Sequence, residues 1–126
     1  NSSGNGKGVV FYANPGGNHD NMQLEGNGGN GKVFACADDV WTMLTFVNKT
    51  NTTELYINGV KQEMTEEEAA KYVVTKGIDA FILGTGQWMD GEYFVGAIDE
   101  VSLYNAALTQ EQVGLLKAEA EGTATE

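Results

Sequence analysis

The residues of this chain best suited to hold a ligand stand in one short polar segment, residues 84–91. Its sequence is Gly-Thr-Gly-Gln-Trp-Met-Asp-Gly, so Trp88 lies among glycines and polar residues that leave it little core to enter. An indole ring offers an apolar surface on which the C–H face of a sugar ring can pack. The neighbouring Gln87 and Asp90 can bond hydroxyl groups. These three residues are candidate ligand-binding residues; alternatively, Trp88 folds back over the end of the domain.

Two residues outside this segment extend the candidate ligand-binding set. Tyr93 follows the segment directly, and His19 follows the turn sequence Asn-Pro-Gly-Gly at residues 14–17. His19 and Asp20 are neighbours, but a His–Asp pair is not catalytic without a nucleophile within reach. The single cysteine, Cys36, stands in an apolar run and is typical of a small core residue. We therefore interpret His19 as a solvent-exposed turn residue that can border a ligand site.

The overall charge limits the partners that this chain can bind. The formal net charge over 126 residues is −11, and all seven basic residues are lysine. Nucleic-acid phosphates and anionic membrane surfaces repel such a protein, so nucleic acid is excluded as a partner. No stretch approaches the roughly 18 apolar residues of a transmembrane helix, so no membrane insertion is expected. The length allows one domain around one core.

The elements that must position the candidate residues are mostly short strands. Seventeen glycines and one proline divide the chain into brief apolar runs, which favours strands joined by turns. Asn58-Gly59 predicts a hairpin with a type I′ turn, since both residues tolerate positive φ. Strands are expected at residues 9–13, 22–25, 32–37, 41–47, 55–57, 60–61, 81–83 and 93–104.

The predicted core draws on several of these strands. Trp41 opens one strand and is expected to pack in the interior. Residues 81–83, Phe-Ile-Leu, are bounded by glycines and are predicted to form a buried strand. The stretch at 93–104 is the longest with a β-like pattern. Its expected core residues are Phe94, Ile98, Val101 and Leu103.

Two capping boxes predict two short helices. Thr65 followed by Glu68 indicates a helix N-terminus, and this accounts for the acidic run 66–68 without an active site. Thr109 followed by Gln112 indicates a second helix, which is expected to cover one end of the domain. The domain is predicted to span residues 1–122, with a flexible tail at 123–126.

Several of these segments together resemble the laminin-G-like domains of the concanavalin A-like lectin and glucanase group. The first half of the resemblance is Trp-Thr-Met-Leu-Thr-Phe at 41–46, followed by Leu-Tyr-Ile-Asn-Gly-Val at 55–60. The second half is Tyr-Phe-Val-Gly-Ala-Ile-Asp-Glu-Val at 93–101, which leads to Tyr-Asn-Ala-Ala-Leu at 104–108 and the helix start. The resemblance implies an all-β antiparallel sandwich of the jelly-roll type, with a short inserted helix and a short C-terminal helix.

The resemblance also implies that the opening strands of such a domain have no counterpart before Val9. In that family those strands pair with the final strand, so their absence would leave Ile98 to Leu103 on a bare edge. Three explanations are open. A preceding segment is missing, another chain supplies it, or this piece was cut from a longer parent protein.

Some members of the family hold a structural calcium ion, and the resemblance makes Asp99 and Glu100 candidate metal ligands. Calcium takes six to eight oxygen ligands, so this pair would need Asp90 and further residues to complete a site. Alternatively, Asp99 ties its strand to a neighbouring loop through hydrogen bonds.

The function that the resemblance implies is non-catalytic binding of a glycan or polysaccharide, or adhesion, by a module of a larger secreted or cell-surface protein. Glycoside hydrolases of this fold carry paired acidic residues in an E-x-D-x-E arrangement, and no such spacing occurs here. We therefore predict that the chain is not an enzyme. A structural spacer or protein-interaction domain is the alternative. A third hypothesis is a fragment of a hydrolase whose catalytic residues lie in the missing part of the domain.

Overall fold

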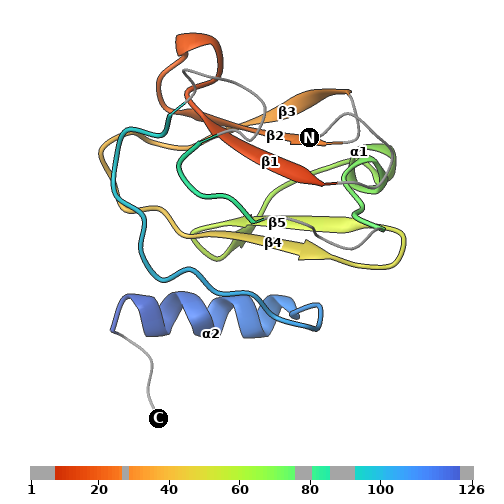
Figure 1. Ribbon diagram of the computed structural model, residues 1–126. Helices are drawn as coiled ribbons and strands as arrows, with labels where there is room; N and C mark the ends of the chain where they lie inside the picture. Colours follow the sequence, from red (N-terminus) through yellow and green to blue (C-terminus); the bar gives the residue numbers. More distant parts are fainter. Residues whose placement is uncertain (1–7, 27–28, 76–80, 86–92, 123–126) are drawn as a thin grey trace.

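The computed structural model describes residues 8–26, 29–75, 81–85 and 93–122, and its regular structure is mainly antiparallel β-sheet (Figure 1). The strands form two three-stranded sheets, which we call sheet A and sheet B. In chain order the elements are β1 (Val9–Ala13), the short 3-10 helix η1 (Pro15–Gly17), β2 (Asn21–Gly26), β3 (Gly29–Ala35), β4 (Leu44–Asn48), β5 (Thr53–Ile57), β6 (Val60–Lys61), α1 (Glu66–Lys71) and α2 (Gln110–Ala120).

Sheet A has the strand order β1-β2-β3. Alternate residues of β2 are buried, so Met22 and Leu24 point to the interior, as the period of two in the sequence predicts. The pairing of β2 with β3 extends into the glycine-rich stretch 26–31, because β3 begins at Gly29 and not at residue 32 as predicted. Gly31 permits this, because a Cβ there would lie 2.3 Å from the carbonyl oxygen of Leu24.

Sheet B has the strand order β4-β5-β6, and its two faces are both covered. The β5–β6 hairpin turns at Asn58 and Gly59, whose φ angles of 52° and 78° confirm the predicted turn with two left-handed residues. Along β5, Leu55 and Ile57 lie on the face toward sheet A, and Tyr56 lies on the opposite face.

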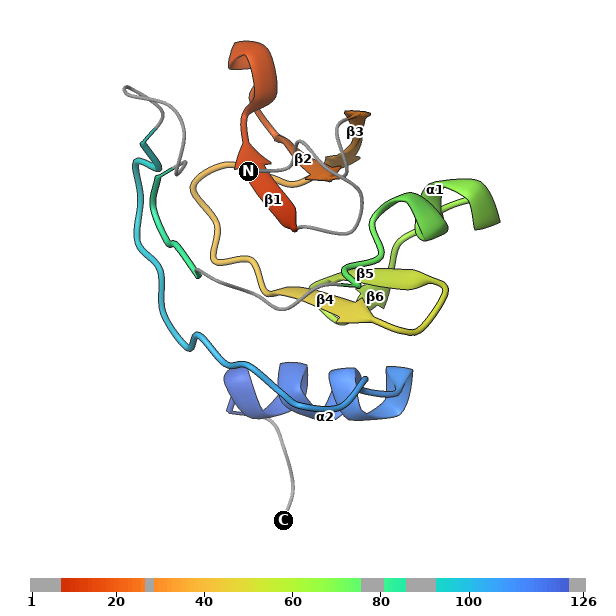
Figure 2. The ribbon, with the colours of Figure 1, turned by 45° about the vertical axis from the view of Figure 1, so that its right-hand side comes forward.

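The two sheets face each other across one hydrophobic core. Met22, Leu24 and Phe34 of sheet A form a single buried cluster with Leu55 and Ile57 of sheet B. This arrangement supports the predicted antiparallel β-sandwich, and Figure 2 shows the two sheets as separate layers. The six strands found in the described ranges do not by themselves make a complete jelly roll.

Helix α1 closes one side of the space between the sheets (Figure 2). Its N-terminus carries the predicted capping box, with reciprocal hydrogen bonds between Thr65 and Glu68. The hydroxyl of Thr53 on β5 donates to the carbonyl of Ala69 at 2.7 Å, and Lys32 on β3 forms an ion pair with Glu68 at 2.6 Å. The residue after the helix, Tyr72, belongs to the buried cluster between the sheets. The helix is therefore fastened to both sheets.

Helix α2 covers the outer face of sheet B, not an end of the sandwich as the sequence predicted. Its capping box of Thr109 and Gln112 is confirmed. Val113 is fully buried in a cluster with Val47 and Tyr56 of sheet B. The expectation of an end cap was wrong because a capping box marks where a helix starts and carries no information about the surface on which it packs.

Three predicted core features are contradicted by the structure. Residues 81–83 lie outside any strand, and all three of their side chains are exposed. Residues 94–104 form no strand either, and the expected core residues Phe94, Ile98, Val101 and Leu103 are exposed. Trp41 is 70% exposed, because β4 begins three residues later, at Leu44. The physical cause is shared, since these residues have no sheet or helix packed over them.

Candidate functional site

The candidate ligand segment is anchored at both of its ends by a short β-bridge. Thr85 pairs with Tyr93 in an antiparallel bridge, and the amide of Phe94 donates to the carbonyl of Gly84 at 2.8 Å. Gly84 has a φ of 82°, a conformation that favours glycine and lets the chain turn there. Tyr93 is 66% exposed, so its ring is available to a ligand.

Three of the sequence-predicted ligand residues, Gln87, Trp88 and Asp90, lie outside the described residues. The bridge nevertheless fixes where their segment starts and ends. Figures 1 and 2 both place the turn at η1, which precedes His19, and the start of the segment that follows Tyr93 at the upper end of the molecule. Within the described ranges, no hydrogen bond or ion pair joins His19 to Tyr93. The described contacts therefore do not join His19 and Tyr93 into one site.

His19 is held by the carboxylate of Asp38, a residue that the sequence did not single out. Nδ1 of His19 lies 2.5 Å from Oδ2 of Asp38, and the same oxygen accepts from the side-chain Nδ2 of Asn14 at 3.3 Å. Asp38 and Asp20 also exchange two bonds between their backbone amides and carboxylates, at 3.3 and 2.9 Å. Asp38 thus fastens the turn between β1 and β2 to the end of β3. The sequence feature that could have pointed to Asp38 is the pair of acidic residues, Asp38 and Asp39, after the third strand.

The charge of His19 follows from this geometry. Its side chain is 77% exposed, which confirms the interpretation as a turn residue at the surface. The hydrogen bond to Asp38 and the negative charge of Asp38 raise the pKa of His19 above its usual 6.5. The same hydrogen bond lowers the pKa of Asp38. The contribution of the pair to stability is therefore complete below about pH 6.5 and is lost as the pH rises through the raised pKa of His19.

We expect a proton NMR titration to find the pKa of His19 above 6.5, since it is the single histidine and its ring signals need no assignment. Asp38→Asn should return this pKa toward 6.5, because it removes both the charge and the strongest acceptor. Asp39→Asn is the matched control, since Asp39 acts on His19 only through weaker charge attraction. Equal effects of the two variants would contradict a specific role for Asp38.

Asp99 and Glu100 do not make a calcium site by themselves. Both are exposed, and Oδ1 of Asp99 accepts a hydrogen bond from the amide of Glu100 at 2.8 Å. Two carboxylates are far from the six to eight oxygens that calcium takes, and no group of three or more metal-binding side chains gathers in the part of the chain that the structure describes. Asp90, which the sequence adds to this pair, lies outside the described residues, so the calcium assignment stays a prediction.

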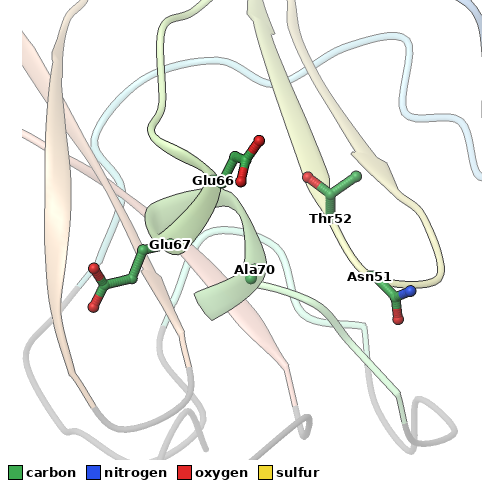
Figure 3. Close-up of a pocket in the computed structure, with 5 residues that line it drawn as sticks. All are labelled: Asn51, Thr52, Glu66, Glu67 and Ala70. Carbon is green, nitrogen blue, oxygen red and sulfur yellow. The ribbon is translucent and has the colours of Figure 1, made fainter.

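An open pocket lies between α1 and the turn that joins β4 to β5 (Figure 3). Asn51 and Thr52 line it from the turn, and Glu66, Glu67 and Ala70 line it from α1. Figure 3 shows Glu66 extending toward the side of Thr52 and Glu67 extending from the other side of the helix. Glycoside hydrolysis needs two carboxyl groups that face each other across the substrate, and these two glutamates do not.

Neither described helix is long and apolar enough to cross a membrane. Comparison with curated proteins gave no match. Among solved structures, the chain is similar to residues 221–444 of an S-layer domain-containing protein from Clostridium thermocellum, with a TM-score of 0.54 and 16% identity. The match covers 87% of this chain and 63% of that one, so this chain spans less than two thirds of the matched structure. At this identity the likeness concerns the fold alone.

The sequence matches a family as well as a fold. The match extends over residues 1–114 and is to the Laminin_G_3 family, described as the concanavalin A-like lectin/glucanases superfamily. This range contains both sheets and the start of α2. The match also includes the two halves of the resemblance read from residues 41–60 and 93–113. The chain therefore belongs to the laminin-G-like family of the concanavalin A-like lectin/glucanase superfamily.

Proposed function

We propose that this chain is part of a non-catalytic carbohydrate-binding module of a cell-surface protein. The observation that carries the proposal is the Thr85–Tyr93 bridge, with Tyr93 exposed at the end of a segment that contains Trp88. An aromatic ring that is fixed at its backbone but uncovered is suited to pack on the apolar face of a sugar. Membership of a superfamily named for lectins and glucanases supports the same class of ligand.

The chemistry of the segment favours a neutral glycan. Gln87 and Asp90 can bond sugar hydroxyls beside the ring of Trp88, which gives the site one apolar surface and polar groups at its border. The formal net charge of −11 repels polysaccharides that carry carboxylate or sulfate groups. We infer that uncharged polysaccharides bind and that acidic ones bind more weakly or not at all.

The proposed place of the module is the cell surface. The structure to which it is similar comes from a protein described as S-layer domain-containing, which supports a location in the layer outside the cell. A binding module there would hold a larger protein against a polysaccharide. The proposal needs no catalytic group.

The experiment is affinity electrophoresis of the full chain through gels that contain one soluble polysaccharide each, from a panel of neutral and acidic polymers. We expect at least one neutral polysaccharide to retard the chain. Trp88→Ala should abolish that retardation, because removing an aromatic residue at the centre of a binding site commonly lowers the affinity by more than about tenfold. Trp41→Ala is the matched control. It removes the other tryptophan, which is also exposed, and should be retarded like the wild type.

Other outcomes of the same gels separate the alternatives. Retardation that survives Trp88→Ala would move the glycan site away from residues 84–93. No retardation by any polymer would favour a structural spacer or protein-interaction domain. A parallel gel with a chelator tests calcium. Loss of retardation there would mean that ligands beyond Asp99 and Glu100 hold a metal ion.

A further inference from the structure

The structure has two hydrophobic clusters, and they depend on different parts of the chain. The cluster between the sheets takes all of its residues, the partly buried ones included, from residues 9–72. The second cluster lies on the outer face of sheet B, where Val47 and Tyr56 contact Val113 of α2. Leu108, just before the helix, packs against this second cluster. The core of the sandwich therefore contains no described residue of α2.

Few side chains hold α2 to sheet B. Val113 is the one buried residue of the described helix. Leu116, Lys117 and Ala118 are half-buried. The helix passes close to the β5–β6 turn, since a Cβ placed on Gly59 would lie 3.2 Å from Cβ of Lys117. Figures 1 and 2 both show α2 as a separate layer beyond sheet B. The attachment is therefore a narrow and mainly apolar contact.

The side-chain hydrogen bonds and the ion pair of α2 lie within the helix itself. Thr109 and Gln112 bond to each other in the capping box, at 2.9 and 3.2 Å. Lys117 forms an ion pair with Glu121, one turn further along. These contacts stabilise the helix but do not fasten it to the sheet. An isolated helix of this length is marginal in water, so the amides of α2 lose their protection once it leaves sheet B.

The connection that precedes α2 leaves the helix room to move. Residues 95–108 make no backbone–backbone hydrogen bond to any other described residue. Figures 1 and 2 show them as an extended trace that runs past the sheets to the start of α2. The other end of this trace is fixed, because the amide of Phe94 donates to the carbonyl of Gly84. The helix can therefore move without breaking a ladder of backbone hydrogen bonds.

The two clusters also differ in the scale of the equilibrium that they support. Burial of one valine side chain shifts an equilibrium by a factor of roughly 10 to 100 toward the closed form. The folding equilibrium of a whole domain exceeds a factor of about 1000. Helix α2, with Val113 as its one buried side chain among the described residues, should therefore open far more often than the sandwich unfolds.

We propose that α2 is a lid on the outer face of sheet B, which opens and closes as one unit while the two sheets stay folded. Opening uncovers Tyr56, which is 1% exposed, and Val47, which is 3% exposed. The hydroxyl of Tyr56 donates to the carboxylate of Glu54 at 2.7 Å, so the uncovered face presents an aromatic ring beside a carboxylate. The lid controls whether this face meets the solvent. The proposal does not depend on glycan binding, because neither Trp88 nor Tyr93 takes part in it.

Hydrogen exchange of the unaltered chain, followed by NMR, tests the lid. The amides of residues 113–118 are compared with those of β5, each relative to its rate in an unfolded chain. We expect the α2 amides to be at least about 30-fold less protected than those of β5 and to be protected to the same extent as one another. Equal protection of α2 and β5 would overturn the proposal, because the helix would then open only with the whole domain. Protection that falls steadily along residues 113–118 would also overturn it, since that is fraying and not opening as a unit.

Val113→Ala tests whether Val113 holds the lid closed. The change removes two buried carbon atoms, so the amides of α2 should exchange about tenfold faster while those of β5 keep their rates. Alanine forms helices better than valine, so faster exchange cannot come from a lower helix propensity. Leu115→Ala is the matched control, because Leu115 is 61% exposed on the same helix and its change should alter the rates by less than about twofold. Equal effects of the two variants would overturn the assignment of the contact to Val113.

Thiol labelling tests which face the lid covers. In a Cys36→Ala background, Val47→Cys places the single thiol of the chain beneath α2, and Leu55→Cys places it between the sheets. Urea unfolding of each protein gives the labelling rate expected from global unfolding alone. We expect iodoacetamide to label the Val47→Cys protein at least about tenfold faster than that rate, and the Leu55→Cys protein at that rate. Labelling of the Val47→Cys protein only at its global rate would overturn the lid.

Discussion

Tyr72→Ala should lower the free energy of unfolding by about 3–5 kcal/mol, the usual cost of removing a buried aromatic ring. Tyr72 is 1% exposed and belongs to the buried cluster that joins sheet A to sheet B. Its hydroxyl also accepts a hydrogen bond from the amide of Lys32 on β3 at 3.0 Å. A domain of this size is stable by only about 5–15 kcal/mol, so the variant should be close to unfolded.

Urea unfolding followed by circular dichroism measures this loss. Tyr72→Phe keeps the ring and removes only the acceptor for Lys32, so we expect a loss of about 1 kcal/mol. Tyr104→Ala is the matched control, because it makes the same change at an exposed tyrosine and should shift stability by less than about 0.5 kcal/mol. A Tyr72→Ala protein as stable as the Tyr104→Ala protein would mean that α1 and the residue after it do not bridge the sheets.

The features predicted correctly from the sequence are those decided by residues a few positions apart. The capping boxes at Thr65 and Thr109 need only a partner three residues on, and both are present. The Asn58-Gly59 turn depends on two residues that tolerate positive φ. The alternation of Met22 and Leu24 with polar residues depends on the period of a strand. Each of these signals acts locally, so no tertiary information was needed.

The features that failed are those decided by contacts between distant segments. Residues 93–104 have the composition of a strand, but a strand exists only where a ladder partner lies beside it. The same reason applies to residues 81–83. Trp41 was expected in the core because a tryptophan opens a strand in the family, and here the strand begins after it. Strand propensity therefore identified the residues that can be buried. The neighbouring strands and helices decided which of those residues are buried.

The candidate site was predicted only in part for the same reason. The exposure of His19 followed from its place after a turn, and the structure confirms it. Asp38 was missed because nineteen positions separate it from His19. The assignments of Gln87, Trp88 and Asp90 stay predictions. A contact between the β1–β2 turn and the connection that follows β3 cannot be read from the local pattern of either segment.

Glu54→Gln should destabilise the protein by about 2 kcal/mol at pH 7, the scale of hydrogen bonds to a charged group, and the effect should disappear in acid. Glu54 lies on β5 with its side chain only 12% exposed. Its carboxylate accepts from Nζ of Lys49 at 2.5 Å, from Nζ of Lys61 at 3.1 Å and from the hydroxyl of Tyr56 at 2.7 Å. These three donors come from the β4–β5 turn, from β6 and from β5 itself.

The pH dependence follows from the sign of the pKa shift. Burial opposes ionisation of Glu54, but the hydrogen bonds from Lys49, Tyr56 and Lys61 outweigh it and lower the pKa from 4.5 to about 2. A carboxyl whose pKa is lower in the folded state stabilises the fold above its unfolded pKa. The stabilisation by Glu54 is therefore complete above about pH 4.5 and is lost as the pH falls toward 2.

Urea midpoints of the wild type and of Glu54→Gln, measured from pH 7 down to pH 2.5, test this account. The difference in unfolding free energy should be constant down to about pH 5 and then shrink, because Glu54 of the unfolded wild type becomes protonated below its pKa of 4.5 while Glu54 of the folded protein stays ionised down to about pH 2. Glu63→Gln serves as the control, since Glu63 is exposed and the change should give a small difference at every pH. A difference for Glu54→Gln that stays the same from pH 7 to pH 2.5 would assign the loss to packing and not to the ionised carboxylate.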